Sequence, residues 1–368
     1  MKPPDLAGSN QHFDLINCTG FIAPLNVRSK RAPLPKCKGM IRMSLNDFVV
    51  DALVHTPSYQ RARLWSVENH EKYSTLAPPE QGTQDTYRFN HEIFLLMRAL
   101  NEQGLNEPGL CADAQGRGPL RSVIGDVAQR LAALGRDRSA HYVELGPEPV
   151  KSACLLKHMA DTCTAVRYTA IDINQTSEPA MRDALGPILS AQGSFNYIAA
   201  DYRTVTREAL HPDEDITLIT LLGFQEGNEW PVSTGRLIRT LAGKGTYVLS
   251  EMQVYEPGLE QTILGFYANA NMVQFSRLVA LQQGFCPMAE HEALLVPLRI
   301  LDETVYVAVT LQPVLHGQTE GFLLTNICLK FTPEQFRRTR ARHCDCRVVD
   351  EFASGDGSVR YQIAEYLQ

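Results

Sequence analysis

Residues 143–149 read Val-Glu-Leu-Gly-Pro-Glu-Pro, and this stretch decides the fold that we expect. The apolar run at 142–145 predicts a buried strand, and Gly146 permits a sharp turn at the end of that strand. The residues from Val150 onward predict a helix, and the free N–H groups at a helix N-terminus favour a ligand anion. This strand, turn and helix predict the first crossover of a parallel sheet with a ligand at its edge.

Strands and helices alternate after this point. Short apolar runs that predict strands lie at 166–171, 197–200, 216–222 and 247–249. This alternation predicts a parallel sheet with helices on both faces. Segments 346–352 and 359–366 flank a Ser-Gly-Asp-Gly turn and predict a closing antiparallel hairpin, which is more typical of methyltransferase sheets than of nicotinamide-binding ones. We therefore predict an α/β fold with a Rossmann-like sheet of the class I methyltransferase type.

The rest of the chain divides into further parts. Residues 1–40 hold five prolines and predict an irregular arm. Residues 41–135 have mainly helical patterns, and we expect them to contribute to a lid. Residues 136–258 and 331–368 would form the cofactor-binding sheet domain. Residues 259–330 break the alternation and predict an inserted substrate lid.

The composition narrows the function. The formal net charge of −6 comes without a basic stripe, which favours a small-molecule partner over nucleic acid. Nine irregularly spaced cysteines predict free thiols in a reducing compartment. No apolar run approaches the roughly 18 residues of a membrane span, so we expect a soluble, cytoplasmic protein. The ligand-type residues around His343 have no second pair nearby, and we predict no metal site.

Acidic residues end the next two predicted strands. Asp172 stands where a carboxylate accepts the hydroxyls of a ribose. Asp201 suits an adenine amino group, and Tyr202 offers a ring for stacking. No Gly-x-Gly-x-x-Gly phosphate loop is present in the sequence, which favours S-adenosylmethionine (SAM) over a nicotinamide cofactor.

Side chains near the first turn complete the predicted cofactor site. We expect Lys151 to pair its ammonium with the ligand carboxylate. Glu148 is either an exposed glutamate favoured by the helix dipole or a contact to the SAM ammonium. The full set of predicted cofactor residues is Glu144, Gly146, Glu148, Lys151, Asp172, Asp201, Tyr202, Leu222 and Gly223.

The fourth predicted strand leads into a loop, 221–228, that reads Leu-Leu-Gly-Phe-Gln-Glu-Gly-Asn. Open parallel sheets place substrates at this edge. Asn228 has both a donor and an acceptor and suits a substrate amine or carboxylate.

These residues resemble the histidine N-alpha-methyltransferases of the ergothioneine pathway. The resemblance covers roughly 142–367, with its best matches at 143–146 with Lys151, at 222–228, at 267–275 and at 327–334. It implies SAM as cofactor and a lid that covers an amino acid. Carried over by position, Asn228 and Tyr267 would hold the substrate and act in catalysis, and Tyr59 would complete the pocket.

The sequence also departs from that family. Pro147, Glu148 and Pro149 stand where a second glycine is usual, which stiffens the loop. Asn326 and Cys328 replace the substrate-binding Glu and Ser of the family. They predict a neutral pocket and make histidine an unexpected substrate.

Three functions follow from this pattern. The first is N-methyl transfer from SAM to a small amino acid or amine. The second is cyclisation of SAM, in which its own amine attacks Cγ and yields azetidine-2-carboxylate and methylthioadenosine, with Glu148 or Asn228 receiving the proton. The third is a binding protein that has lost catalysis.

Overall fold

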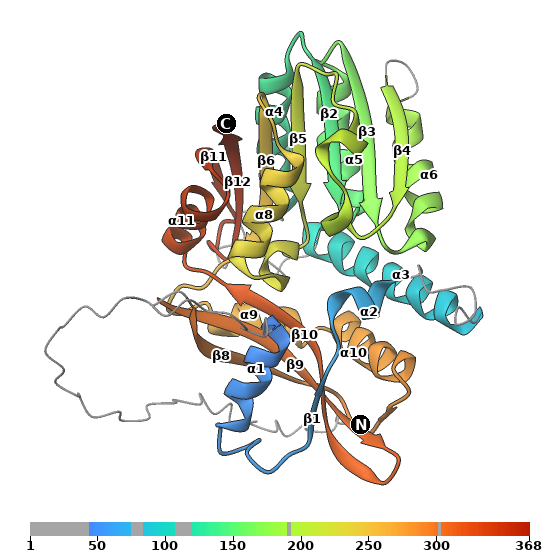
Figure 1. The fold of residues 1–368 in the computed structure, drawn as a ribbon, viewed down its shortest axis with the longest axis vertical. Coiled ribbons are helices and arrows are strands. Elements are labelled where there is room, and N and C mark those ends of the chain that lie inside the picture. The colour runs from blue at the N-terminus through green and yellow to red at the C-terminus, as the bar shows by residue number, and fades with distance from the viewer. Residues whose placement is uncertain (1–43, 75–83, 107–119, 190–192, 301–302) are drawn as a thin grey trace, which may run out of the picture.

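The computed structural model of the protein describes residues 44–74, 84–106, 120–189, 193–300 and 303–368. The predicted arm at 1–40 lies outside the described residues. The described part forms two sheets, one above the other in Figure 1, with helices packed on both.

The upper sheet has seven strands in the order β11-β12-β6-β5-β2-β3-β4. These strands are β2 (Ser139–Leu145), β3 (Ala165–Asp172), β4 (Gly193–Ala199), β5 (Ile216–Leu221), β6 (Thr246–Gln253), β11 (Cys346–Ala353) and β12 (Val359–Tyr366). Strands β2 to β6 pair in parallel, whereas β12 is antiparallel to both β6 and β11. The predicted fold class is confirmed: the sheet is Rossmann-like, of the class I methyltransferase type, with an antiparallel C-terminal hairpin.

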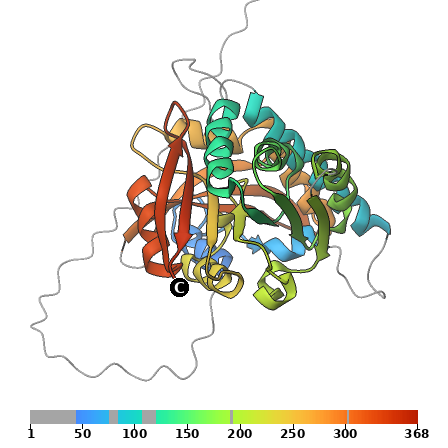
Figure 2. The ribbon, with the colours of Figure 1, turned by 90° about the horizontal axis from the view of Figure 1, so that it is seen from above.

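Helices cover both faces of this sheet, as Figure 2 shows from above. The helices are α4 (Leu120–Gly135), α5 (Pro149–Ala160) and α6 (Glu178–Leu189), with α7 (Arg207–Leu210), α8 (Pro231–Leu241) and α11 (Pro333–His343). Successive strand residues face opposite sides. Tyr142 accordingly packs in one hydrophobic cluster with Leu155, and Val143 packs in another with Ile238.

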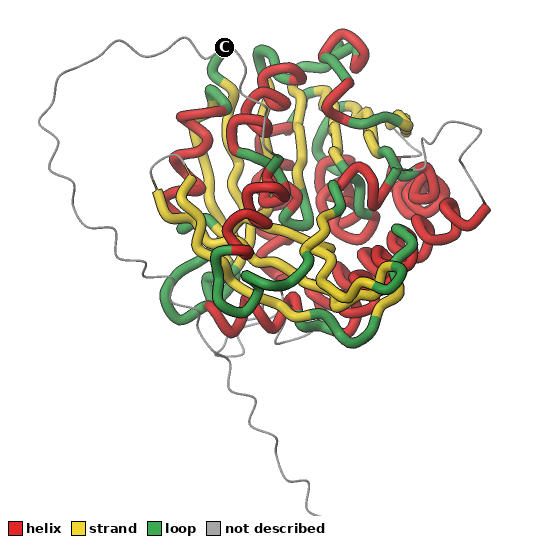
Figure 3. The backbone as a smooth tube through the Cα atoms, turned by 60° about the horizontal axis from the view of Figure 1, so that its bottom comes forward, coloured by secondary structure: helices red, strands yellow, loops and turns green. Residues whose placement is uncertain are grey.

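The lower sheet is built mainly from the chain between β6 and α11. Its strands are β7 (Cys286–Pro287), β8 (Glu292–Ile300), β9 (Glu303–His316) and β10 (Thr319–Lys330), with the distant β1 (Leu64–Ser66) at one edge. Its helices are α9 (Glu260–Tyr267) and α10 (Ala270–Gln282), and the N-terminal helices α1 (Leu45–Val54) and α2 (Asn69–Tyr73) adjoin it. Figure 3 shows this sheet from below.

The N-terminal region is not purely helical, because β1 runs parallel to β10 with Leu64 opposite Phe322. A three-residue strand is too short to show a period in the sequence. Helix α1 begins after Ser44, whose side chain accepts a hydrogen bond from the Asp47 N–H. Thr332 and Gln335 form a capping box at the start of α11.

Helix α3 (Gln84–Asn106) lies at the junction of the two sheets. On the upper side, the Asn174 side chain donates to the Asn90 carbonyl. On the lower side, Asn269 and Asn271 both donate to the Gln103 side chain. Although α3 has 23 residues, neither it nor any other helix in the described ranges is long and apolar enough to cross a membrane.

The loop after β5 packs directly on β10 through Gly227. A Cβ at this position would lie 2.4 Å from Cys328 Sγ and 3.0 Å from the Leu329 carbonyl oxygen. We expect Gly227→Ala to lower the free energy of unfolding by about 1–3 kcal/mol, because this site has no room for a methyl group.

Urea unfolding measures this effect. Gly125→Ala in α4 is the matched control, since a Cβ there meets nothing within 4 Å. Removing an interior helix glycine should stabilise the control by about 0.5–1 kcal/mol. Equal stability of Gly227→Ala and the wild type would contradict the packing described here.

Candidate functional site

A cavity of about 390 Å³ lies at the carboxyl ends of the parallel strands. It falls within the range of pockets that hold small molecules. Its walls come from the loops after β2, β3, β4 and β5 and from α1, α2 and α3. The predicted residues that line it are Gly146, Glu148, Asp172, Asp201, Tyr202, Leu222, Gly223 and Asn228.

Gly146 makes the turn that the sequence predicts. Its φ is +62°, and its N–H donates to the Ile171 carbonyl across 3.0 Å. A Cβ on Gly146 would lie 2.9 Å from Gln225 Nε2. Both the backbone conformation and the close approach of Gln225 therefore favour glycine here.

Glu148 is not an exposed first-turn glutamate. It is the N-cap of α5 and is buried, and its carboxylate accepts from the N–H groups of Val150 at 2.7 Å and Lys151 at 2.9 Å. Burial raises the pKa of this carboxyl. Because Glu148 already satisfies these two N–H groups, they are not free to hold a ligand anion as the sequence predicts.

Lys151 pairs with a carboxylate of the chain itself and is not part of the cavity lining. Its ammonium contacts both carboxylate oxygens of Glu251 at 2.8 and 2.7 Å, and both side chains are buried. Glu251 also accepts from the Gly223 N–H at 2.6 Å and from the Tyr361 hydroxyl at 2.6 Å. Through Glu251, Lys151 thus positions Gly223 in the cavity wall.

Glu144 is also buried outside the cavity lining. It accepts from the hydroxyls of Ser152 and Tyr168 and from the Glu148 N–H. Burial raises the pKa of Glu144 to about 7. Its contacts hold the turn that contains Glu148, and Glu144 itself is not part of the cavity lining.

Asp172 lines the cavity at the end of β3. It accepts from the Asn174 N–H at 3.0 Å and from the Ser177 hydroxyl at 3.3 Å. Burial raises the pKa of Asp172 to about 7 despite these hydrogen bonds. A carboxylate has about four acceptor positions, so Asp172 keeps capacity for ligand hydroxyls.

Asp201 is paired with Arg203, a residue that the sequence analysis did not single out. Arg203 Nη2 lies 2.6 Å from Asp201 Oδ2, and Arg203 Nε lies 3.0 Å from each carboxylate oxygen. Burial alone would raise the pKa of Asp201, but the hydrogen bonds and charge of Arg203 outweigh burial and lower it. Asp201 is therefore an ionised acceptor on the cavity wall.

The loop after β5 holds an unusual backbone conformation. Gly223 has φ +67°, and Phe224 has φ +61°, which is rare for a bulky residue. The Phe224 ring lies 5.9 Å from the Lys151 ammonium and 5.2 Å from the Lys330 ammonium. Two residues further along the chain, the buried Glu226 forms an ion pair with the buried Arg340. These contacts hold Phe224 in a conformation that costs free energy, and such residues cluster at functional sites.

The predicted substrate residues are not all gathered at the cavity. Asn228 lines it, whereas Tyr59, Tyr267, Asn326 and Cys328 are buried outside its lining. The Tyr59 hydroxyl donates to Glu292.

The predicted substrate pocket around Tyr267 contains a lysine of the chain itself. Lys330 is buried, and its ammonium donates to the Tyr267 hydroxyl at 2.7 Å and lies 3.1 Å from Cys328 Sγ. Lys330 therefore contacts two of the side chains that the resemblance gives to a substrate.

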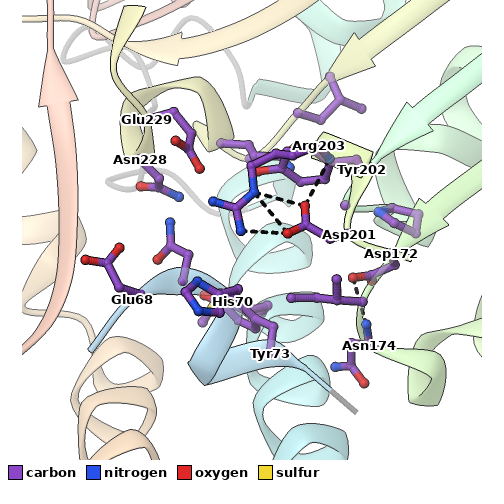
Figure 4. A pocket seen from close by; sticks show the side chains of 18 of the residues that line it. Glu68, His70, Tyr73, Asp172, Asn174, Asp201, Tyr202, Arg203, Asn228 and Glu229 are labelled. Atoms are coloured by element: carbon purple, nitrogen blue, oxygen red, sulfur yellow. Dashed lines mark hydrogen bonds and ion pairs between the residues drawn. The ribbon is translucent and has the colours of Figure 1, made fainter. Parts of the chain in front are cut away.

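Other cavity residues come from elements that the sequence analysis did not connect to the site. Glu68, His70 and Tyr73 belong to α2 or its start, and Glu229 directly follows Asn228. Figure 4 shows Glu68, Asn228 and Glu229 on one side and Asp172 and Asn174 on the other, with the Asp201 pair between them. Arg203 and Glu229 stand next to predicted residues, which is a signal that could have found them. The α2 residues carry no such signal.

Comparisons with known proteins add little to this geometry. No family model matches the chain, and no curated protein matches it. Among solved structures, a SAM-dependent methyltransferase from Clostridium acetobutylicum aligns at 8% identity over 67% of this chain and 92% of its own, with a TM-score of 0.40. A putative methyltransferase from Thermobifida fusca aligns at 14% identity over 76% and 94%, with a TM-score of 0.40. The sugar N-methyltransferase KedS8 from Streptoalloteichus aligns at 13% identity over 68% and 90%, with a TM-score of 0.34.

The buried pair of Lys151 and Glu251 yields a stability prediction. We expect Lys151→Ala to lower the free energy of unfolding by about 3–5 kcal/mol, because it leaves the Glu251 carboxylate buried without its cation. Lys151→Met combined with Glu251→Gln should cost less, since neither side chain of the pair then carries a charge.

Denaturant unfolding compares these variants with Arg347→Ala. Arg347 pairs with Glu365 at 2.7 Å on the surface, and such pairs contribute only about 0–1 kcal/mol. A loss for Lys151→Ala no larger than for Arg347→Ala would show that the buried pair is not essential.

Proposed function

We propose that this protein is a SAM-dependent methyltransferase that acts on an amine or a small amino acid. The observation that carries the proposal is the cavity at the carboxyl ends of the parallel strands, with Gly146, Asp172 and Asp201 on its wall in chain order. Ligands of open parallel sheets bind in this position.

The wall chemistry fits the parts of SAM. Asp172 supplies acceptors for the ribose hydroxyls, and Asp201 supplies an acceptor for the adenine amino group. Tyr202 offers an aromatic surface, and Leu222 and Gly223 form the wall after β5. Arg98 of α3 also lines the cavity, and we assign it the carboxylate-binding role that the sequence gave to Lys151.

In this reaction the protein positions the two substrates and excludes water from the cavity. SAM supplies an electrophilic methyl group, and a neutral amine must stand in line with it. Asn228 is the predicted substrate residue on the cavity wall, and its side-chain oxygen can accept from the amine. Tyr267 and Lys330 lie outside the cavity lining and act on the loop after β5 through Phe224, whose ring contacts the Lys330 ammonium. We therefore propose Tyr267 as a positioning residue.

The cyclisation of SAM is the second candidate. One observation favours it: Tyr267, which the resemblance gives to a second substrate, is buried outside the cavity lining and contacts Lys330 instead. In this reaction an N–Cγ bond forms as the Cγ–S bond breaks, and the electron pair leaves on the sulfur of methylthioadenosine. The amine proton passes to a cavity acceptor, for which Glu148 and Asn228 are the candidates. A binding protein without catalysis would retain SAM unchanged.

Mass spectrometry after incubation with SAM alone separates these candidates. We expect no methylthioadenosine and no azetidine-2-carboxylate, and we expect S-adenosylhomocysteine once an amine substrate is added. Formation of both cyclisation products from SAM alone would replace methyl transfer with the second candidate.

Asp172 makes a pH-dependent contribution to SAM affinity. Ribose hydroxyls donate to the ionised carboxylate, so binding favours loss of its proton. With a pKa of about 7, Asp172 is largely protonated at pH 6. We expect affinity to fall about tenfold from pH 8 to pH 6 through this group. The folding stability of the protein without ligand depends on pH with the opposite sign. A carboxyl group with a raised pKa stabilises the fold at low pH, and this contribution is lost as the pH rises through about 7.

Calorimetric titration with SAM at several pH values checks this expectation. Asp172→Asn should bind SAM more weakly at pH 8 and lose this part of the pH dependence. Asp213→Asn is the control, because Asp213 is exposed and is not part of the cavity lining. An unchanged pH profile in Asp172→Asn would remove Asp172 from the binding site.

A further inference from the structure

Two carboxylates face the end of the cavity that contains Asn228. Glu68 stands at the start of α2, and Glu229 ends the turn after β5. Figure 4 shows both on the same side of the cavity as Asn228. The guanidinium labelled near them, that of Arg203, is hydrogen-bonded to both oxygens of Asp201, so its charge is largely balanced there.

The charges around Glu229 show that this end is electronegative. Burial raises the pKa of the Glu229 carboxyl most strongly, and the charge of Arg203 opposes that effect. The negative charges of Glu68 and Asp201 raise the pKa further. His70 also lines the cavity. A cation bound here would relieve the repulsion between the carboxylates.

Neutral groups in the cavity lining also suit a cationic donor. Gln225 lines the cavity, and its buried side-chain oxygen accepts no hydrogen bond among the described residues. A buried acceptor without a donor costs free energy that a ligand N–H would recover. Trp230 also lines the cavity, and an indole attracts cations to its face.

We propose that this end of the cavity binds an amine without a carboxylate group, in its ammonium form, through Glu229 and Glu68. The proposal rests on the proposed methyl transfer and narrows its substrate from an amino acid or amine to an amine. A ligand carboxylate at this end would be repelled by Glu68 and Glu229, and the guanidinium labelled beside them, that of Arg203, is already hydrogen-bonded to Asp201. Tyr267 offers it no alternative position in this cavity, because Tyr267 is buried outside the cavity lining.

The same residues account for the proton. The bound ammonium gives one proton to the Glu229 carboxylate and becomes a neutral amine. The nitrogen lone pair then forms the N–C bond to the methyl group as the C–S bond breaks, and that electron pair stays on sulfur. The products are a methylated ammonium and S-adenosylhomocysteine. The raised pKa of Glu229 suits a group that must hold this proton.

Matched pairs of amines and amino acids test the proposal. The full chain saturated with S-adenosylhomocysteine is titrated with histamine, tyramine, putrescine and agmatine, and with histidine, tyrosine, ornithine and arginine. Methyl transfer from SAM to the same compounds is followed by mass spectrometry. We expect at least one amine to bind and react, with kcat/KM at least tenfold above that of its parent amino acid.

Substitutions then test the carboxylates. Glu229→Gln should weaken binding of that amine at least tenfold and leave SAM affinity within twofold, which also shows that the variant is folded. Glu68→Gln should weaken amine binding in the same direction. Glu320→Gln is the matched control, since Glu320 is exposed at the start of β10 and lies outside the cavity lining.

The outcomes separate this inference from the proposed function. If the wild type fails to bind SAM, the proposed function itself is wrong. If SAM binds but amino acids are preferred, if no amine binds, or if Glu229→Gln binds the amine like the wild type, this inference is overturned. If SAM binds and amino acids are preferred, the proposed function remains, with amino acids as the methyl acceptors.

Discussion

The buried carboxylate of Glu251 is the interaction on which the geometry of the cavity depends. It joins three elements, because it accepts from Lys151 of α5, from the Gly223 N–H after β5 and from Tyr361 of β12. Removing a carboxylate from water is costly, and only a cation with further hydrogen bonds compensates for it. The first crossover, the loop that bears Asn228 and the C-terminal hairpin are therefore fixed relative to one another through one side chain.

Local patterns were sufficient to predict the sheet and the ends of its strands. Asp172 and Asp201 each follow an apolar run, and parallel strands bring their carboxyl ends to one edge. The partners of side chains were not predictable in this way. Lys151 and Glu251 stand 100 residues apart, and no period in the sequence connects them. Glu148 was ambiguous for a related reason, since capping of α5 and contact with a ligand need the same residue at the same position.

The substrate end shows a second limit of sequence reasoning. The resemblance placed Tyr267 and Cys328 at a substrate, but it gave no role to Lys330, two residues after Cys328, whose ammonium contacts both. The α2 residues reach the cavity only because β1 pairs with β10, more than 250 residues later in the chain. A contact of that separation follows from tertiary packing and leaves no local signal.

The position of α3 has a consequence for ligand selection. Its side-chain hydrogen bonds tie it to the turn after β3 and to the start of α10, while Gly227 abuts β10 elsewhere at the junction. Two separate attachments resist rotation of one sheet against the other, so the cavity is largely shaped before a ligand arrives. A preformed site loses little conformational entropy on binding. It discriminates by fit and charge instead of by closure, and a bulky molecule is excluded at entry even when its reactive group is suitable.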